Sequence, residues 1–240
     1  NPYSASAVKT LFDFNSQYPA DFRTIHSWEL LHNTLLQLGA NVTVLERIDT
    51  NNIAIFVRDP IIASPDRIYT QHIPSYTKTY AAKNFLREHR LLRKIIQHKG
   101  IDSSEADIDI DGGDIIPIKS PNGTISYFIG GFSDGKIRKA TSFFRNEGHS
   151  AYKVRIYPDY QGILVHGDMV LGQVPNGKVL AFIDGVGSDC NFEINLVGAV
   201  GKESVVNLSE EMALGGAANG ISVGTTHIMP ICDAELRSEE

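Results

Sequence analysis

The chain contains little cysteine: its 240 residues include two, Cys190 and Cys232. Two cysteines do not make the disulfide framework of a small secreted domain. No run approaches the roughly 18 apolar residues of a membrane span, and the opening NPYSASAVKT is not typical of a signal peptide. No membrane partner is therefore expected. The compartment stays open, with the cytoplasm slightly favoured and secretion allowed.

The chain also lacks a dense run of Lys and Arg, and its formal net charge is −6. This balance argues against a general nucleic-acid binder. The most basic stretch, residues 87–99, carries apolar residues at helical spacing, which is typical of an amphipathic helix with a solvated basic face. With 42% hydrophobic residues and no linker or low-complexity segment, residues 1–240 are predicted to form a single α/β domain. The sequence does not indicate an oligomeric state.

Apolar periodicity and turn residues predict a repeating order of helix, strand and strand with a period near 50 residues. The dipeptide Asn122-Gly123 predicts a hairpin. Helices are predicted over residues 27–38, 80–99, 136–147 and 209–219. Strands are predicted over residues 41–45, 53–57, 115–118, 125–129, 152–157, 162–165, 179–183 and 221–231.

Three short acidic signatures recur at intervals of a little over 50 residues, each next to an apolar run. They are Phe56-Val57-Arg58-Asp59, Asp111-Gly112-Gly113-Asp114 and His166-Gly167-Asp168. If each run is a strand, a repeated unit delivers a carboxylate or an imidazole to the same end of successive modules. A cyclic fold builds a polar pocket around its axis in this way. Each signature alone is also an ordinary turn or local ion pair. The three in order favour a functional pocket.

The carboxylates of these signatures, if they converge, require a cation, because removing several negative charges from water together is costly. The four are Asp59, Asp111, Asp114 and Asp168. A guanidinium fits, since its planar fork can be held bidentately by two carboxylates. A hard metal ion such as Mn²⁺ is the alternative. His166, two residues before Asp168, is a candidate general acid or base, which favours the guanidinium, with no metal or other cofactor.

The same signatures resemble those of the pentein superfamily of guanidino-group-modifying enzymes, which includes arginine deiminase and dimethylarginine dimethylaminohydrolase. Phe56 to Pro60 resembles the F-x-R-D-P segment of arginine deiminases. Asp111 to Asp114 resembles their E-G-G-D, with Asp in place of Glu. His166 to Met169 resembles their H-L-D segment, with Gly in place of Leu. The resemblance spans roughly residues 25–230 in the same order.

This resemblance implies a five-fold pseudosymmetric α/β propeller of ββαβ-type units around a narrow central pocket. Asp59 and Asp168 would hold the substrate guanidinium, and Asp111 would orient His166 or the substrate. His166 would transfer protons to the leaving amine and from water. Phe56, Arg58 and Asp114 complete the substrate-binding set that the resemblance implies. A cysteine thiolate would attack the guanidino carbon and form a covalent intermediate.

The chain departs from the family where that thiolate is expected. Matching Gly224-Thr225-Thr226 to the residues that follow the family's cysteine places Val223 at the nucleophile position. Matching on Met229-Pro230 places Thr226 there instead, and neither residue is a thiol. Cys232 is a weak candidate nucleophile, and Cys190 a weaker one. The turn that contains Gly130 and Gly131 also lacks the arginine that often follows the equivalent glycine in these hydrolases.

Three functions follow as hypotheses. The first is a guanidine-directed hydrolase acting on free arginine, a methylated arginine, agmatine or a protein-borne arginine. The second is a catalytically inactive pentein that binds a guanidinium ligand or a partner protein. The third is a metal-dependent hydrolase that uses the aspartates and His166.

Overall fold

The described residues form three copies of one ββαβ unit. A computed structural model describes residues 22–42, 61–63, 67–71, 80–108, 110–131, 133–157, 160, 164, 166–187 and 191–229. The first unit consists of β1 (Ile61–Ala63), β2 (Ile68–Gln71), α3 (Tyr80–His98) and β3 (Ser103–Ala106). The second consists of β4 (Ile115–Lys119), β5 (Ile125–Ile129), α4 (Asp134–Asn146) and β6 (Ser150–Lys153). The third consists of β7 (Leu171–Gln173), β8 (Val179–Ala181), α5 (Phe192–Val200) and β9 (Val205–Asn207).

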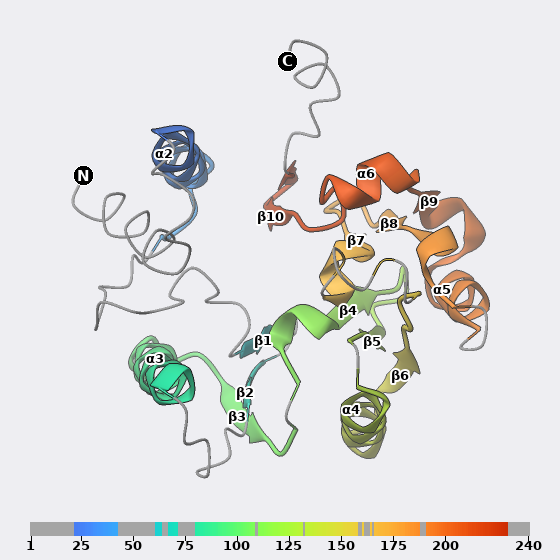
Figure 1. Cartoon of the computed structure of the whole chain (residues 1–240), viewed down its shortest axis with the longest axis horizontal. Helices are drawn as coiled ribbons and strands as arrows, with labels where there is room; N and C mark the ends of the chain where they lie inside the picture. Colours follow the sequence, from blue (N-terminus) through green and yellow to red (C-terminus); the bar gives the residue numbers. More distant parts are fainter. Residues whose placement is uncertain are drawn as a thin grey trace.

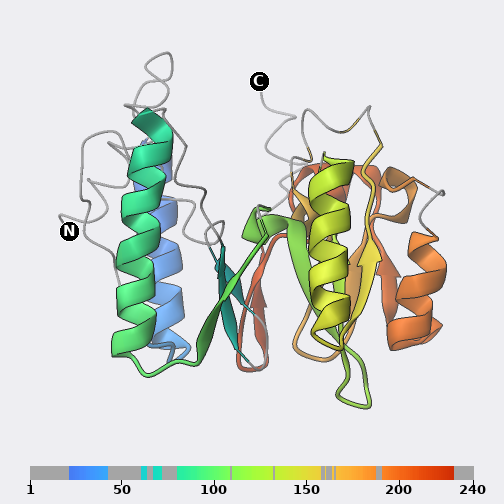
Figure 2. The same cartoon turned by 90° about the horizontal axis from the view of Figure 1, so that it is seen from below.

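All three units share one topology. The first two strands pair antiparallel and the third lies parallel to the second, because a helix carries the chain back between them. Helices α3, α4 and α5 lie on the outside, and the first strands β1, β4 and β7 lie inside (Figure 1). Figure 2 shows the same three helices with roughly parallel axes. The predicted ββαβ repeat is confirmed.

Further elements precede and follow these units. Helix α2 (Phe22–Gln37) comes first, and α6 (Glu210–Leu214), β10 (Ile221–Val223) and β11 (Thr226–Ile228) come last. Short 3₁₀ turns also occur: η1 (Gly112–Asp114), η3 (Gly167–Met169), η4 (Ile183–Gly185) and η6 (Lys202–Ser204). None of the helices in this part of the chain is both long and apolar enough to span a membrane.

The predicted helices are confirmed, with ends that differ from the prediction by up to five residues. Helix α4 begins before the predicted start because the Ser133 hydroxyl accepts a hydrogen bond from the Lys136 amide, 3.4 Å away. Helix α6 is shorter than predicted and ends at Leu214, although Ser209 caps it as expected, with its hydroxyl 3.3 Å from the Met212 amide. The predicted hairpin over residues 115–129 is confirmed as β4 and β5.

Two strand predictions are wrong. The segment 221–231 was expected as one strand, but it folds back at Gly224, whose φ of 57° suits a tight turn, so that β10 pairs with β11. The strand expected over residues 152–157 lies earlier, as β6, and Ile156 makes an isolated bridge to Val186. The strand expected over residues 53–57 lies outside the described residues, as do most of those over 41–45 and 162–165.

The hydrophobic core sits between neighbouring units, and the alternation of side chains along β4 and β5 creates it. Ile116 and Phe128 point into a cluster shared with the third unit, whereas Ile115 and Tyr127 point into a cluster shared with the first. Phe144 stacks on Tyr127 with ring centroids 3.9 Å apart. The sheet of the second unit therefore packs on both faces and holds the first and third units in place.

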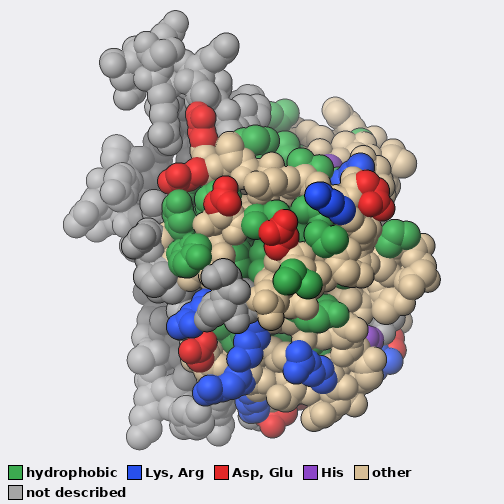
Figure 3. Space-filling model, turned by 90° about the vertical axis from the view of Figure 1, so that its right-hand side faces the viewer, with side chains coloured by type: hydrophobic (Ala, Val, Ile, Leu, Met, Phe, Trp, Pro, Cys, Tyr) green, Lys and Arg blue, Asp and Glu red, His purple; other side chains and the backbone are tan. Residues whose placement is uncertain are grey.

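The surface carries hydrophobic side chains among charged ones. Helix α5 lies at the right-hand edge of Figure 1, and its Ile194 is 73% exposed. On the face of Figure 3, Lys and Arg gather mainly toward the lower part and Asp and Glu toward the upper part.

Candidate active site

Two of the acidic signatures form the same local structure in successive units. Asp111 is extended and precedes η1, which leads directly into β4. His166 is likewise extended and precedes η3, after which β7 begins at Leu171. The two 3₁₀ turns contact each other. The repeated unit therefore brings signatures that lie over 50 residues apart in sequence to one place.

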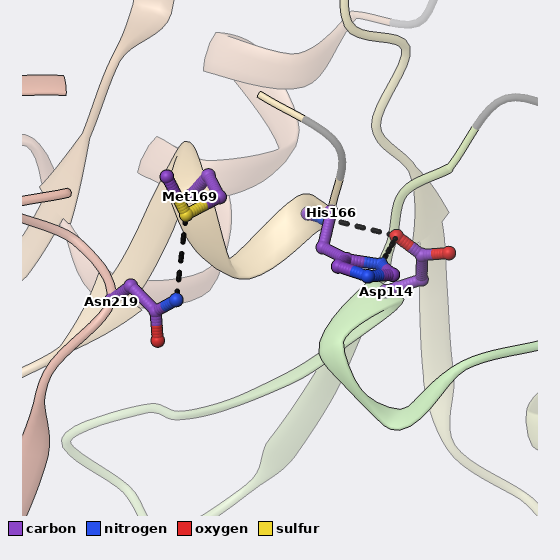
Figure 4. Close-up of polar contacts among 5 residues, drawn as sticks. Asp114, His166, Met169 and Asn219 are labelled. Atoms are coloured by element: carbon purple, nitrogen blue, oxygen red, sulfur yellow. Dashed lines mark hydrogen bonds and ion pairs between the residues drawn. The ribbon is translucent and has the colours of Figure 1, made fainter. Parts of the chain in front are cut away.

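The centre of this place is a contact between a buried carboxylate and an imidazole. Asp114 Oδ1 lies 3.3 Å from His166 Nδ1, and the same oxygen accepts a hydrogen bond of 3.1 Å from the Gly167 amide (Figure 4). The Asp114 side chain is 10% exposed and that of His166 is 28% exposed. A carboxylate held by a backbone amide fixes the orientation of the imidazole and stabilises its protonated form. His166 therefore has the geometry of a proton-transferring group that can still reach solvent or a ligand.

Asp168 lies against the same turn. Its side chain is buried, and a Cβ built on Gly113 would meet Asp168 Oδ2 at 3.3 Å and His166 Cγ at 3.2 Å. The bare backbone of Gly113 thus allows η1 to approach both residues. A carboxylate near the imidazole of His166 adds the negative charge that a guanidinium would need.

Glycines allow the neighbouring units to interlock. A Cβ on Gly167 would meet Ile116 Cδ1 at 2.7 Å and Gly130 Cα at 3.3 Å. A Cβ on Gly131, whose φ is 108°, would meet Asp114 Oδ2 at 2.8 Å. The glycine that replaces leucine in the H-L-D pattern therefore lies in a tightly packed place in this chain. The sequence alone does not show this role, because it depends on the close approach of Gly130 to Gly167 from a neighbouring unit.

The structure brings together four of the predicted site residues: Asp111, Asp114, His166 and Asp168. The family resemblance implies that Asp111 orients His166 or the substrate and that Asp114 binds the substrate. In the structure Asp114 makes the 3.3 Å contact with His166, while Asp111 is exposed at the start of the turn. Ligand atoms of Asp111, Asp114 and His166 lie within 4.8 Å of one another, so these three form the group among the described residues that could hold a metal ion.

The remaining predicted site residues are only partly placed. Phe56, Arg58 and Asp59 lie outside the described residues, as do Cys190 and Cys232. Val223 ends β10 and pairs with Thr226 across the hairpin. The chain before this hairpin contacts the third unit, because Asn219 Nδ2 lies 3.4 Å from Met169 Sδ (Figure 4). The last residue of η3 therefore lies beside the segment that leads into β10.

Comparison with known proteins shows similarity of structure without detectable similarity of sequence. No protein-family model and no curated protein matches the chain. The N-terminal domain of ArgZ, a cyanobacterial arginine dihydrolase, in a cysteine-to-serine variant bound to substrate, matches with a TM-score of 0.65 and 15% identity over 90% of this chain and 75% of that chain.

Two further solved structures match. AgrE in a ternary complex with ornithine and NAD⁺ has a TM-score of 0.59 and 17% identity over 84% of this chain and 28% of that chain. DDAH from Pseudomonas aeruginosa, complexed with citrulline, has a TM-score of 0.56 and 17% identity over 91% of this chain and 76% of that chain. These matches confirm the expected fold class, the α/β propeller fold that these arginine-modifying enzymes share.

Proposed function

We propose, starting from the pentein fold of this chain, that it binds and acts on a guanidinium compound of the arginine type as an amidine hydrolase. The observation that carries the proposal is the contact between buried Asp114 and His166, beside buried Asp168. This arrangement combines negative charge, which a guanidinium requires, with an imidazole that can transfer protons.

In the proposed reaction, carboxylates hold the N–H groups of the substrate, and Asp168 is the described residue best suited to this. A nucleophile attacks the guanidino carbon, and His166 donates a proton to the departing amine, so that the C–N bond breaks. Water then attacks the same carbon, with His166 accepting its proton, and a ureido product is released. Asp114 keeps the His166 ring oriented through both steps. Cys232 is a weak candidate for the nucleophile in this reaction.

The proposal is tested with L-arginine, methylated arginines and agmatine as substrates and with mass spectrometry of the products in H₂¹⁸O. Turnover that incorporates ¹⁸O into a ureido product, and that is lost in His166→Asn, supports it. Cys232→Ser and Cys190→Ser, assayed side by side, identify the nucleophile. Absence of turnover for every guanidine contradicts the hydrolase assignment.

A second candidate function is binding of the guanidinium ligand without turnover. The observation that favours it is the residue at the expected nucleophile position: Val223 pairs with Thr226 in the last hairpin, and neither side chain is a thiolate. Saturable binding of L-arginine with no product, lost in Asp168→Ala, would identify the chain as a binding protein. Activity that is abolished by EDTA and restored by Mn²⁺ would instead favour the metal-dependent alternative.

A further inference from the structure

A second polar site lies in a pocket of about 550 Å³ between β4, β7 and the hairpin β10–β11. Its apolar wall includes Ile116, Pro117 and Leu171, and its polar wall includes Lys119, Ser222 and His227. None of the described residues that line it is an aspartate or a glutamate, and none belongs to the Asp114–His166 site. The pocket is therefore chemically unlike the guanidinium site proposed above.

The hairpin places a hydroxyl against an imidazole. Ser222 and His227 are direct partners across β10 and β11, and Ser222 Oγ lies 2.9 Å from His227 Nδ1. Residues directly opposite each other in an antiparallel pair project to the same face. The tight turn at Gly224 fixes the register, so the pair is held by the backbone. Val223, next to Ser222 along the strand, does not line this pocket, as the alternation of side chains requires.

Packing fixes the His227 ring. The ring lies against Gly220, so closely that a Cβ on that residue would overlap Nε2 and Cε1. Desolvation by burial lowers the pKa of His227 below its usual 6.5, so the imidazole is neutral at neutral pH. Among the residues with a described position, Nε2 has no hydrogen-bond partner. The tautomer with its proton on Nε2 leaves Nδ1 free to accept the proton of Ser222.

Another serine in the same pocket lacks such a base. The Ser120 hydroxyl interacts with Asn122 Oδ1 and with the Thr124 carbonyl, the latter at 2.9 Å. Those groups hold the hydroxyl in a turn and cannot serve as a general base near neutral pH. Ser222 differs from it in having an imidazole at hydrogen-bond distance, which is the arrangement that activates a serine.

We propose that Ser222 and His227 form a nucleophile–base pair that hydrolyses a small carboxylic ester bound in this pocket. Ser222 Oγ bonds to the acyl carbon while its proton passes to His227 Nδ1, and the ester C–O bond breaks as the alcohol leaves with that proton. Water then attacks the acyl-serine, gives its proton to Nδ1, and releases the carboxylic acid as Ser222 regains its hydrogen. Lys119, the cation of the described pocket wall, stabilises the negative charge that develops on the acyl oxygen.

The test uses a fluorophosphonate probe, which transfers its phosphonyl group to an activated serine with loss of fluoride. Intact-mass measurement and peptide mapping of the full chain should locate one adduct on Ser222. Ser222→Ala should abolish that adduct, His227→Gln should slow its formation by about 100-fold or more, and Ser120→Ala should label like the wild type. Hydrolysis of p-nitrophenyl acetate should follow the same order.

Gly220→Ala provides a second variant that keeps both reactive side chains. Because its methyl group would displace the His227 ring, we expect slower labelling while circular dichroism shows that the chain remains folded. Absence of an adduct on Ser222 in the wild type, or wild-type labelling rates in folded His227→Gln, would overturn the proposal. Neither result bears on arginine binding at the other site.

Discussion

Asp114 Oδ1 lies 3.3 Å from His166 Nδ1, and this contact joins the second ββαβ unit to the third. The carboxylate stands at the end of one 3₁₀ turn and the imidazole at the start of the next. The contact is therefore a product of the repeat itself, since equivalent turns of neighbouring units meet at the inner end of the first strands. Asp114 and His166 are far apart in sequence, and they meet because the same backbone turn occurs in two neighbouring units.

Replacing Asp114 by Asn tests the orienting role of this carboxylate. Asn keeps an oxygen for the Gly167 amide but removes the charge that stabilises a protonated His166, so we expect turnover of arginine to fall by about 100-fold or more. The loss of unfolding free energy should be only about 1 kcal/mol. Steady-state kinetics and urea unfolding of the same preparations measure the two effects. Asp107→Asn, at a site that is 80% exposed, is the matched control and should change neither.

Restoring leucine at position 167 tests the packing argument. A side chain there would collide with Ile116 Cδ1 and Gly130 Cα, so Gly167→Leu should lower the free energy of unfolding by about 1–3 kcal/mol. Gly198→Ala, where the added methyl group meets nothing within 4 Å, should be neutral or slightly stabilising.

Ile116→Val removes the atom in closest conflict with the new side chain. The double variant Gly167→Leu/Ile116→Val should therefore lose less stability than the two single variants lose together. Strict additivity in urea unfolding would show that position 167 does not pack against Ile116.

The depressed pKa of His227 predicts a pH dependence of stability. Burial disfavours the charged ring, so the unfolded chain binds a proton more readily than the folded one. The contribution of His227 to stability is therefore fully present above its ordinary pKa of 6.5 and is lost as the pH falls toward the lower folded value. Thermal melting from pH 8 to about pH 5, compared between wild type and His227→Gln, isolates this term. A difference between the two that stays constant with pH would contradict it.

Installing a thiol at the position that the pentein resemblance assigns to the nucleophile tests whether the surrounding site is competent. Val223→Cys should create or raise turnover of L-arginine, because Asp114 and His166 are already placed to handle protons. Thr225→Cys, in the turn between β10 and β11, is the matched control and should give no gain. The readouts are ureido product and a covalent intermediate trapped on the new cysteine. If the variant binds arginine but gives neither the ureido product nor the covalent intermediate, the His166 ring is not positioned to assist a nucleophile at position 223.

The sequence predicts those elements whose own residues carry a strong pattern. Helix α3 shows a regular apolar stripe, and Asn122-Gly123 marks the β4–β5 hairpin. The bounds that the sequence predicts for both elements therefore lie close to the observed ones. The sequence does not predict helix α5, because its exposed face also carries an apolar residue, Ile194, which is 73% exposed. The pattern of the buried residues Phe192 and Leu196 is therefore not distinct in the sequence. Strands such as β7 and β9 have three residues each, and pairing with β8 defines them more than intrinsic preference does.

The same distinction applies to the candidate site. The acidic signatures could be read as members of one pocket, because their spacing matches the length of a unit. The sequence does not predict which carboxylate contacts His166. Asp111 and Asp114 are separated by two glycines, and the geometry of that turn decides which side chain points toward His166. The Ser222–His227 pair was also missed, because the expected continuous strand would have kept these residues far apart along one chain direction. The turn at Gly224 brings them together.

Equilibrium binding of L-arginine shows whether Asp168 and its neighbours form a guanidinium site. Isothermal titration of the wild type should show saturable binding of L-arginine and weaker binding of L-citrulline, whose ureido group carries no charge. Asp168→Ala should weaken arginine binding at least about tenfold, which is about 1.4 kcal/mol, while Asp107→Asn should bind as the wild type does. Equal affinity in Asp168→Ala and the wild type, or no saturable arginine binding at all, would contradict the assignment of this cluster as a guanidinium site.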